Sequence, residues 1–233
     1  MSLPSRDAGY GGAENLEVMR EARNYNAWLL RLIHRYAPAS GHILDFGAGQ
    51  GTFALPLQLE GRAVTCVEPD PALAASLCAQ GLTAVSTVAQ LENAAFDFAY
   101  TLNVLEHIED DAAALAALHA KLRPGGRLLV YVPAFQVLYG SMDRRVGHLR
   151  RYRRLDLVRR VRAAGFAIEK SQYADSIGFF AALAFRLLRS ESTGDLARAH
   201  VRLYDRLAFP LSLALDLLCR PFFGKNVTVV ARR

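Results

Sequence analysis

The stretch from Ile43 to Thr52 reads ILDFGAGQGT, and it decides the fold that we expect. A short apolar run breaks into three alternating glycines, Gly47, Gly49 and Gly51, directly before a helical pattern. This order predicts a buried strand, a tight turn and the N-terminus of a helix. Because glycine has no Cβ, a flat ligand can lie against the exposed backbone amides of such a turn.

Asp45, two residues before the first glycine, distinguishes this turn from a dinucleotide-binding loop. The glycines are spaced GxGxG and not GxGxxG, and a carboxylate at this place would repel a pyrophosphate. It favours a cationic ligand instead, since Coulomb attraction is strong in a partly dry cleft. S-adenosylmethionine carries an ammonium and a sulfonium group and fits this description.

An acidic residue followed by three glycines resembles the first motif of the class I S-adenosylmethionine-dependent methyltransferases. The segment LNVLEHI, from Leu102 to Ile108, is similar to a second segment of that family. The string DRRVGHLRRY, from Asp143 to Tyr152, resembles a group of bacterial methyltransferases often linked with polyprenyl or surface-glycan pathways. The resemblance runs from about residue 25 to residue 173 and implies an antiparallel last strand.

Strands and helices alternate along the rest of the chain. Beyond the apolar run before the glycines, we expect strands at residues 62–67, 82–86, 96–101, 127–132, 166–173 and 226–232. We expect helices at residues 14–36, 52–60, 71–80 and 110–122, with LRPGG at 122–126 as a turn. This alternation predicts a Rossmann-like α/β fold with a doubly wound, mostly parallel sheet of seven strands.

The chain is expected to divide into a core and two additions. Residues 1–40 would form an N-terminal lid and helix, in which Tyr10 and Tyr25 are candidates to close over a cofactor. Residues 41–175 would form the methyltransferase core, and residues 225–233 its last strand. The second addition lies between these two parts of the core.

Residues 176–224 are this second addition, a hydrophobic helical insertion before the last strand. Pro210 is expected to kink or divide its second helical stretch. Helices this apolar must cover something, because leaving them in water would expose a large patch. A cap over the substrate, a homodimer face and contact with an anionic membrane surface are the open alternatives, and the flanking arginines suit the last of them.

The residues expected to bind the cofactor follow the ends of successive strands. Glu68 lies about twenty residues past the glycine loop, where an acid accepts both ribose hydroxyls. Relatives place an acid after the third strand to accept from the adenine amine, whereas this chain has Thr87 in that region. The full expected cofactor set is Asp45, Gly47, Ala48, Gly49, Gly51, Glu68, Pro69, Thr87, Leu102 and Asn103.

Residues 133–152 leave the sheet at its carboxyl edge, beside the expected sulfonium, and supply the candidates for the acceptor side. Methyl transfer is an in-line displacement, so holding the reactants in line supplies much of the acceleration. If the acceptor is a hydroxyl, His148 is the best base, and Asp143 would orient it. The alternative is that both residues merely tie down the loop. The expected substrate residues are Tyr139, Tyr152 and His107, the last being either a pocket base or a loop fastener.

Nine arginines between Arg144 and Arg162 form the densest positive charge of a chain whose net charge is +6. Three readings are open: a solvated face, a clamp for an anionic substrate, or a nucleic-acid surface. No NPPY-like motif follows the fourth strand and no appended RNA-binding module is recognisable, which argues against nucleic acid. An RNA or protein methyltransferase and a non-catalytic scaffold stay as alternatives.

Cysteine spacing and hydropathy indicate the cellular compartment of the protein. Cys66, Cys78 and Cys219 are far apart and form neither a disulfide framework nor a zinc-ligand spacing, so we assign no metal ligands. The N-terminus lacks the apolar core of a signal peptide, and charged residues interrupt every apolar run before it reaches about 18 residues. The sequence therefore predicts a cytoplasmic enzyme, with contact at the inner face of the membrane left open, that methylates a small or lipid-linked acceptor at oxygen.

Overall fold

The computed structural model describes residues 19–187 and 194–233, and its centre is a seven-stranded sheet in the order β3-β2-β1-β4-β5-β7-β6. The strands are β1 (His42–Phe46), β2 (Ala63–Val67), β3 (Thr83–Val85), β4 (Phe96–Leu102), β5 (Leu122–Pro133), β6 (Ala167–Ala174) and β7 (Asn226–Arg232). β7 runs antiparallel to both of its neighbours, β5 and β6, and the other neighbouring strands pair in parallel. The predicted doubly wound, mostly parallel sheet is confirmed.

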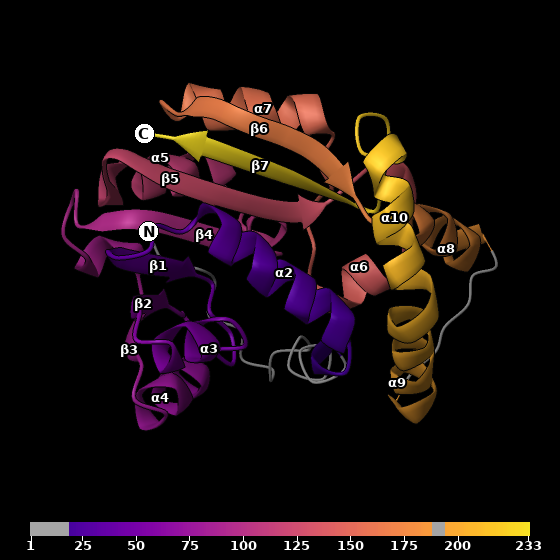
Figure 1. Cartoon of the computed structure of the whole chain (residues 1–233), viewed down its shortest axis with the longest axis horizontal. Helices are drawn as coiled ribbons and strands as arrows, with labels where there is room; N and C mark the ends of the chain where they lie inside the picture. Colours follow the sequence, from indigo (N-terminus) through magenta and orange to yellow (C-terminus); the bar gives the residue numbers. More distant parts are fainter. Residues whose placement is uncertain (1–18, 188–193) are drawn as a thin grey trace.

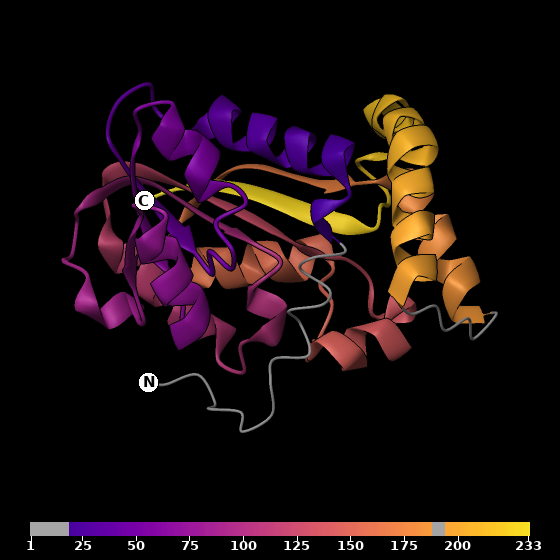
Figure 2. The same ribbon diagram turned by 90° about the horizontal axis from the view of Figure 1, so that it is seen from below.

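Helices cover both faces of this sheet (Figures 1 and 2). One face carries α2 (Arg23–Tyr36), α3 (Ala54–Leu59) and α4 (Pro71–Ala79), and the other carries α5 (Asp111–Lys121) and α7 (Arg154–Ala163). Each layer has its own apolar core, with Ile33 and Leu57 on the first face and Leu115 and Val161 on the second. Burial on both faces explains why the strands read as nearly continuous apolar runs.

Two elements begin elsewhere than predicted. The LRPGG segment is the irregular start of β5 and not a turn outside the sheet, because Phe96 pairs with Leu122 and Phe98 with Arg127, so that the residues between bulge out. The helix predicted at residues 14–36 is interrupted: residues 19 and 20 are helical, residues 21 and 22 are not, and α2 begins at Arg23. Residues before 19 lie outside the described part, and so does the lid candidate Tyr10.

The insertion stands as a separate group of helices at one end of the sheet (Figure 1). It comprises α8 (Ser176–Leu187), α9 (Gly194–Leu203), the π-helical turn η4 (Tyr204–Ala208) and α10 (Phe209–Cys219). Pro210 lies just after the π-helical turn. Proline cannot donate to the carbonyl four residues earlier, and a π turn is one of the few ways in which a helix accommodates that loss.

Buried aspartates fasten the insertion to the core. The Asp205 carboxylate accepts the N–H groups of Asn24 and Tyr25, each at 2.8 Å. The Asp216 carboxylate accepts the N–H groups of Asp175 at 2.7 Å and Ser176 at 2.9 Å. These bonds satisfy N–H groups at the starts of α2 and α8 that have no partner within their own helices. The insertion is thereby fixed in orientation against α2.

Candidate functional site

The carboxyl ends of β1, β2, β4 and β5 meet at one edge of the sheet. From β1 the strand order runs outward to β2 and β3 on one side and to β4 and β5 on the other. Open α/β sheets bind ligands at such a switch point. The glycine loop follows β1, Glu68 follows β2, Asn103 follows β4, and residues 134–152 follow β5.

The glycine loop has a backbone that only glycine adopts easily. Gly47 has φ +86°, and Gly49 and Gly51 also have positive φ. A Cβ at Gly47 would lie 2.4 Å from Cγ2 of Val104, in the segment after β4. The Gly47 and Ala48 amides donate to the Val67 carbonyl at the end of β2. The loop is therefore wedged between the strand ends, with no room for a larger residue at its first glycine.

Glu68 is the acid that closes the glycine loop. It is buried, and its carboxylate accepts the Gly49 amide at 2.7 Å and the Asp70 amide at 3.0 Å. Burial raises the pKa of Glu68, and the two amide hydrogen bonds oppose that rise. The Glu68 amide donates to the Val85 carbonyl, which brings the end of β3 next to Glu68. Thr87 follows Val85 by two residues and is half-buried, and Pro69, directly after Glu68, is exposed.

Asp45 lies beneath the loop with its carboxylate 2.7 Å from the hydroxyl of Tyr100, which donates to it. The side chain is 3% exposed. Burial raises the pKa of Asp45 to about 7, the Tyr100 hydrogen bond lowers it, and the charge of Glu68 raises it. A carboxylate held at this edge in a low-dielectric setting attracts a cation strongly.

Asn103 turns the chain at the end of β4. Its φ is +57°, an unusual value for a residue other than glycine. Its amide donates to the Tyr131 carbonyl at 2.8 Å, and its side-chain amide donates to the hydroxyl of Tyr25 on α2 at 3.4 Å. Tyr25, one of the lid candidates, is thus brought to the residue expected at the methionine end of the cofactor. Leu102 is half-buried beside them.

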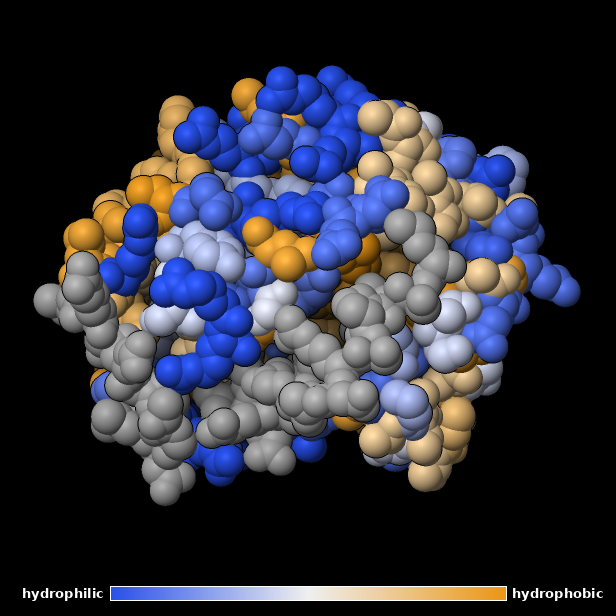
Figure 3. Space-filling view, turned by 180° about the vertical axis from the view of Figure 1, so that it is seen from behind, coloured by the Kyte–Doolittle hydropathy of each residue, from blue (hydrophilic) through white to orange (hydrophobic). Residues whose placement is uncertain are grey.

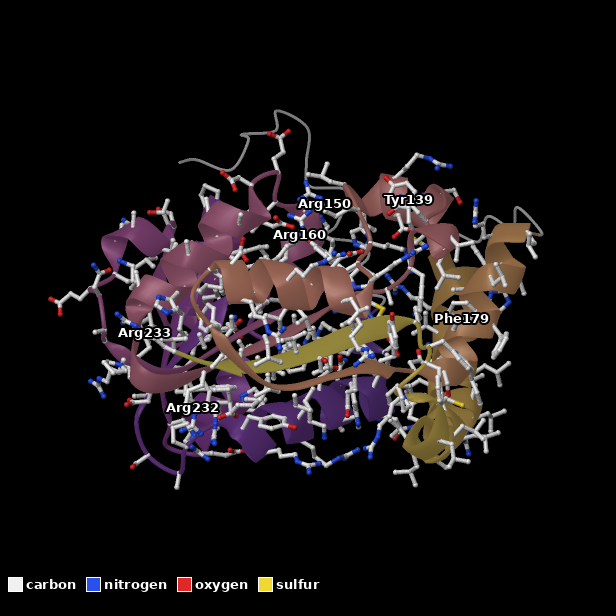
Figure 4. The ribbon with its side chains drawn as sticks, turned by 90° about the horizontal axis from the view of Figure 1, so that it is seen from above. Tyr139, Arg150, Arg160, Phe179, Arg232 and Arg233 are labelled. Atoms are coloured by element: carbon white, nitrogen blue, oxygen red, sulfur yellow. The ribbon has the colours of Figure 1, made fainter. Side chains whose placement is uncertain are left out.

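Tyr152 is buried, and its hydroxyl lies 2.8 Å from Asp111 and 3.1 Å from the Leu105 carbonyl. Asp111 is also buried and pairs with Arg150 and Arg160, which lie side by side above α7 (Figure 4). The geometry makes Tyr152 a fastener of the loop to the core, in contrast to the substrate contact that we expected. Tyr139 donates its hydroxyl to the His148 carbonyl at 2.7 Å.

Asp143 and His148 come together as predicted, in a short helix, α6 (Ser141–Val146), and the residues after it. Asp143 accepts from Nδ1 of His148 at 2.7 Å, from Nε of Arg151 at 2.8 Å and from the Gly140 amide at 2.8 Å. Burial alone would raise the pKa of Asp143, but these bonds and the Arg151 charge lower it to about 2. Asp143 is therefore ionised and fixes the His148 ring.

Glu106 completes this group, and we did not predict it. It lies in the 3-10 turn η2 (Leu105–His107), is 0% exposed, and has no hydrogen-bond partner for either carboxylate oxygen among the described residues. Burial raises the pKa of Glu106 to about 8. Its Oε1 lies 3.7 Å from Nε2 of His148, and the His107 and His148 rings meet edge to face at 4.7 Å.

The Glu106 cluster consists of Glu106, His107 and His148. In the described residues, this group has side chains of metal-ligand type close enough together to bind one ion. One ligand atom from each residue lies within 4.8 Å of the others. The signal in the sequence was the LEH of the LNVLEHI segment together with the GH of the 143–152 string, which lie 41 residues apart and meet only in the folded chain. The cluster therefore offers both proton acceptors and cation ligands.

Some of the arginines in residues 144–162 form ion pairs within the protein. Arg150, Arg151 and Arg160 pair with the buried carboxylates of Asp111 and Asp143. Arg144, Arg145, Arg153 and Arg162 are exposed. An ion pair also joins Arg159 to Asp156 on the surface of α7. Three of the nine arginines of the predicted basic cluster thus pair with buried carboxylates.

The chain is similar in sequence to known methyltransferases. A family described as "Methyltransferase domain" matches residues 7–171. The ubiquinone biosynthesis O-methyltransferase of Xylella fastidiosa is 32% identical over 112 residues, 43% of this chain and 46% of that protein. The enzyme of the same name from Paramagnetospirillum magneticum is 37% identical over 92 residues, 36% of this chain and 37% of that protein. The aligned stretches thus span less than half of either relative.

Solved structures agree on the fold. A crystal structure from Thermotoga maritima, described as an S-adenosylmethionine-dependent methyltransferase and possible histamine N-methyltransferase, superposes with a TM-score of 0.62 over 94% of both chains at 19% identity. Within residues 19–187 and 194–233, no helix combines the length and apolarity that crossing a bilayer requires.

Proposed function

This chain belongs to the methyltransferase-domain family, and from that premise we propose that it methylates a hydroxyl group of a small acceptor. S-adenosylmethionine is its cofactor and, when bound, supplies an electrophilic methyl group on a sulfonium. The observation that carries the choice of oxygen is the cluster around the buried Glu106, in which ionised Asp143 holds His148. The aligned ubiquinone biosynthesis O-methyltransferases support the same choice.

We assign the cofactor to the switch point between β1 and β4. The fit rests on the tight turn of positive-φ glycines, whose first glycine has no room for a Cβ, and on Glu68, whose oxygens each retain a lone pair for a ribose hydroxyl. Asp45 supplies negative charge beneath the loop. Asn103 and Leu102 are assigned to the methionine end, and Thr87 and Pro69 to the outer rim.

On the acceptor side, the chain has to orient a hydroxyl and take away its proton. Residues 134–152 follow β5 at the same sheet edge as the glycine loop, so an acceptor held by them can be aligned with the methyl group. Proton removal is assigned to the Glu106 cluster, with Asp143 positioning His148 and Tyr139 steadying the backbone at His148.

A matched panel of acceptors tests the choice of oxygen. Purified full-length chain is incubated with isotope-labelled S-adenosylmethionine and with aromatic acceptors of one skeleton that carry either hydroxyls or amines, such as dihydroxy- and diaminobenzoates. We expect labelled methyl ethers and no N-methyl product, measured by mass spectrometry. Labelling of amines alone, or of added RNA in a salt-sensitive manner, would overturn the proposal. Cofactor binding without any product would favour the scaffold alternative.

A second candidate for the acceptor is a molecule with a lipid tail that the chain methylates at an anionic membrane surface. A stripe of exposed apolar side chains along α9, η4 and α10 favours this candidate. The stripe has its large apolar side chains between 41% and 76% exposed at helical spacing, namely Leu203, Leu207, Leu211, Leu215, Leu218 and Phe222. Figure 3 shows hydrophobic residues gathered at this end of the molecule. Between residues 202 and 222 the exposed charges are arginines, since Asp205 and Asp216 are buried. Apolar side chains flanked by cations suit an anionic lipid surface.

Vesicle sedimentation tests this stripe. The wild-type chain is expected to co-sediment with vesicles containing phosphatidylglycerol, and the pair Leu211→Glu and Leu218→Glu to reduce the bound fraction roughly fivefold, because each change adds a like charge to the lipid-facing side. Leu59→Glu, at an 87% exposed leucine on α3, is the matched control and should bind normally. Equal binding of both variants, or a stripe covered by a second copy in size-exclusion chromatography, would contradict this candidate.

A further inference from the structure

We infer that Glu106, His107 and His148 form a binding site for one divalent transition-metal cation of the Zn²⁺ and Mn²⁺ class. The site lies at the sheet edge, between the segment that follows β4 and the segment that follows β5. None of the three residues belongs to the set assigned to the cofactor. Two imidazoles and one carboxylate are a ligand set that this class of ions accepts, with coordination positions left over for water or an acceptor.

The first argument is that a ring nitrogen of His148 faces a buried carboxylate that has no hydrogen-bond partner in the described residues. Nδ1 of His148 lies 2.7 Å from the Asp143 carboxylate, so Nε2 is the ring nitrogen that faces Glu106. Nε2 lies 3.7 Å from Oε1 of Glu106, and the Glu106 side chain is fully buried. A buried carboxylate in this position needs a proton or a cation beside it.

The second argument concerns distances. Ligand atoms around a tetrahedral Zn²⁺ lie about 3.4 Å apart, given bonds of about 2.1 Å. The His148 to Glu106 separation of 3.7 Å is already near this value, and the third ligand atom is within 4.8 Å. A small side-chain rotation closes the remaining gap. The His107 and His148 rings meet edge to face with their centres 4.7 Å apart, so both imidazoles lie close to the Glu106 carboxylate.

The third argument is that the surroundings hold the ligands as metal sites do. A histidine ligand usually donates its other ring nitrogen to a carboxylate, and Asp143 takes this role for His148. Arg151 and the Gly140 amide hold Asp143 in turn. The Leu149 amide donates to the Glu106 carbonyl at 2.8 Å, which ties the two segments together at the site. The Glu106 and His148 side chains are therefore held on both segments by other residues.

The charges also balance with an ion present. Glu106 and Asp143 carry two negative charges when ionised, and Arg151 returns one positive charge. A divalent cation makes the sum +1, which an ionised acceptor hydroxyl would bring to zero. The ion would lower the pKa of a bound hydroxyl, whose proton then leaves to water. This catalytic role rests on the proposed O-methylation and makes His148 a ligand in place of a base; the binding site itself does not depend on it.

Metal titration of the full-length chain tests the site. EDTA-treated protein is titrated with Mn²⁺ by electron paramagnetic resonance and with Zn²⁺ by calorimetry. We expect one ion per chain and an affinity at least about tenfold lower in Glu106→Gln and in His148→Gln. Glu60→Gln and His34→Gln change a surface glutamate and histidine that pair with each other outside the cluster, and they should bind like the wild type.

The same samples separate this inference from the proposed function. Circular dichroism first establishes that each variant is folded, and S-adenosylmethionine is titrated into the metal-free wild type. A wild type that binds the cofactor but no ion, or ion binding that survives both cluster substitutions, overturns the metal site and leaves methyl transfer standing. One ion bound at the cluster in a chain that methylates nothing supports the site and overturns the proposed function alone.

Discussion

The variant Glu68→Gln is expected to bind S-adenosylmethionine roughly 100-fold more weakly than the wild-type chain. A carboxylate can accept two ribose hydroxyls through charge-assisted hydrogen bonds, each stronger than a bond to a neutral acceptor. Glutamine keeps the shape but has one accepting oxygen and no charge. That oxygen is also needed by the Gly49 or the Asp70 amide, because both amides donate to the carboxylate in the fold. Calorimetric titration measures the loss.

Two controls make this result specific to the ribose. S-adenosylhomocysteine has the same ribose, so its affinity should fall by the same factor. Glu169→Gln changes an acid of β6 that pairs with Arg127 and Arg232 far from the loop, and it should leave both affinities unchanged. Unchanged cofactor affinity in folded Glu68→Gln would remove Glu68 from the cofactor site and place the ligand elsewhere along the sheet edge.

Most of the fold could be predicted from local sequence patterns. The glycine turn was predictable because positive φ and close approach are properties of a few neighbouring residues, as Gly47 against Val104 illustrates. The strands were predictable because burial on both faces gives them apolar runs. LRPGG was read as a turn for the same local reason, although the glycine at 125 with φ +81° belongs to a bulge inside β5. Propensity cannot distinguish a turn between elements from a bulge within one.

The parts that were missed depend on contacts between distant segments. Asp205 caps α2 across 181 residues of chain, and no local signal links it to Asn24. Glu106 is an ordinary helix-forming residue in the sequence, and its burial without a partner among the described residues arises only when the loop after β5 covers it. Tyr152 was expected to contact the substrate, but its hydroxyl bonds to the buried Asp111 carboxylate. Such residues become visible only with tertiary structure.

Replacing Asp45 with asparagine is expected to stabilise the free protein at neutral pH while weakening cofactor binding. The folded chain raises the pKa of Asp45 from 3.8 to about 7, chiefly through burial. Between about pH 4 and pH 7 the folded state therefore holds more protons than the unfolded state, so wild-type stability falls as pH rises through this window. Asparagine cannot ionise, and its amide oxygen still accepts the Tyr100 hydroxyl. The variant should lack this slope and gain about 1 to 4 kcal/mol at pH 8.

Urea unfolding at pH 5 and pH 8 measures the slope, and titration at pH 8 measures the affinity. S-adenosylmethionine carries cationic groups and should lose roughly tenfold or more in affinity when the Asp45 charge is gone. Methylthioadenosine, which shares the adenosine but has no charged tail, should bind both chains equally. An equal loss of affinity for the two ligands would mean that the Asp45→Asn substitution has distorted the glycine loop. If the stability of the wild type and that of the variant changed equally between pH 5 and pH 8, Asp45 would be ionised in the folded chain at both pH values. The first result would separate Asp45 from the recognition of the cationic cofactor, and the second would contradict the raised pKa of Asp45 while leaving its charge available to the cofactor.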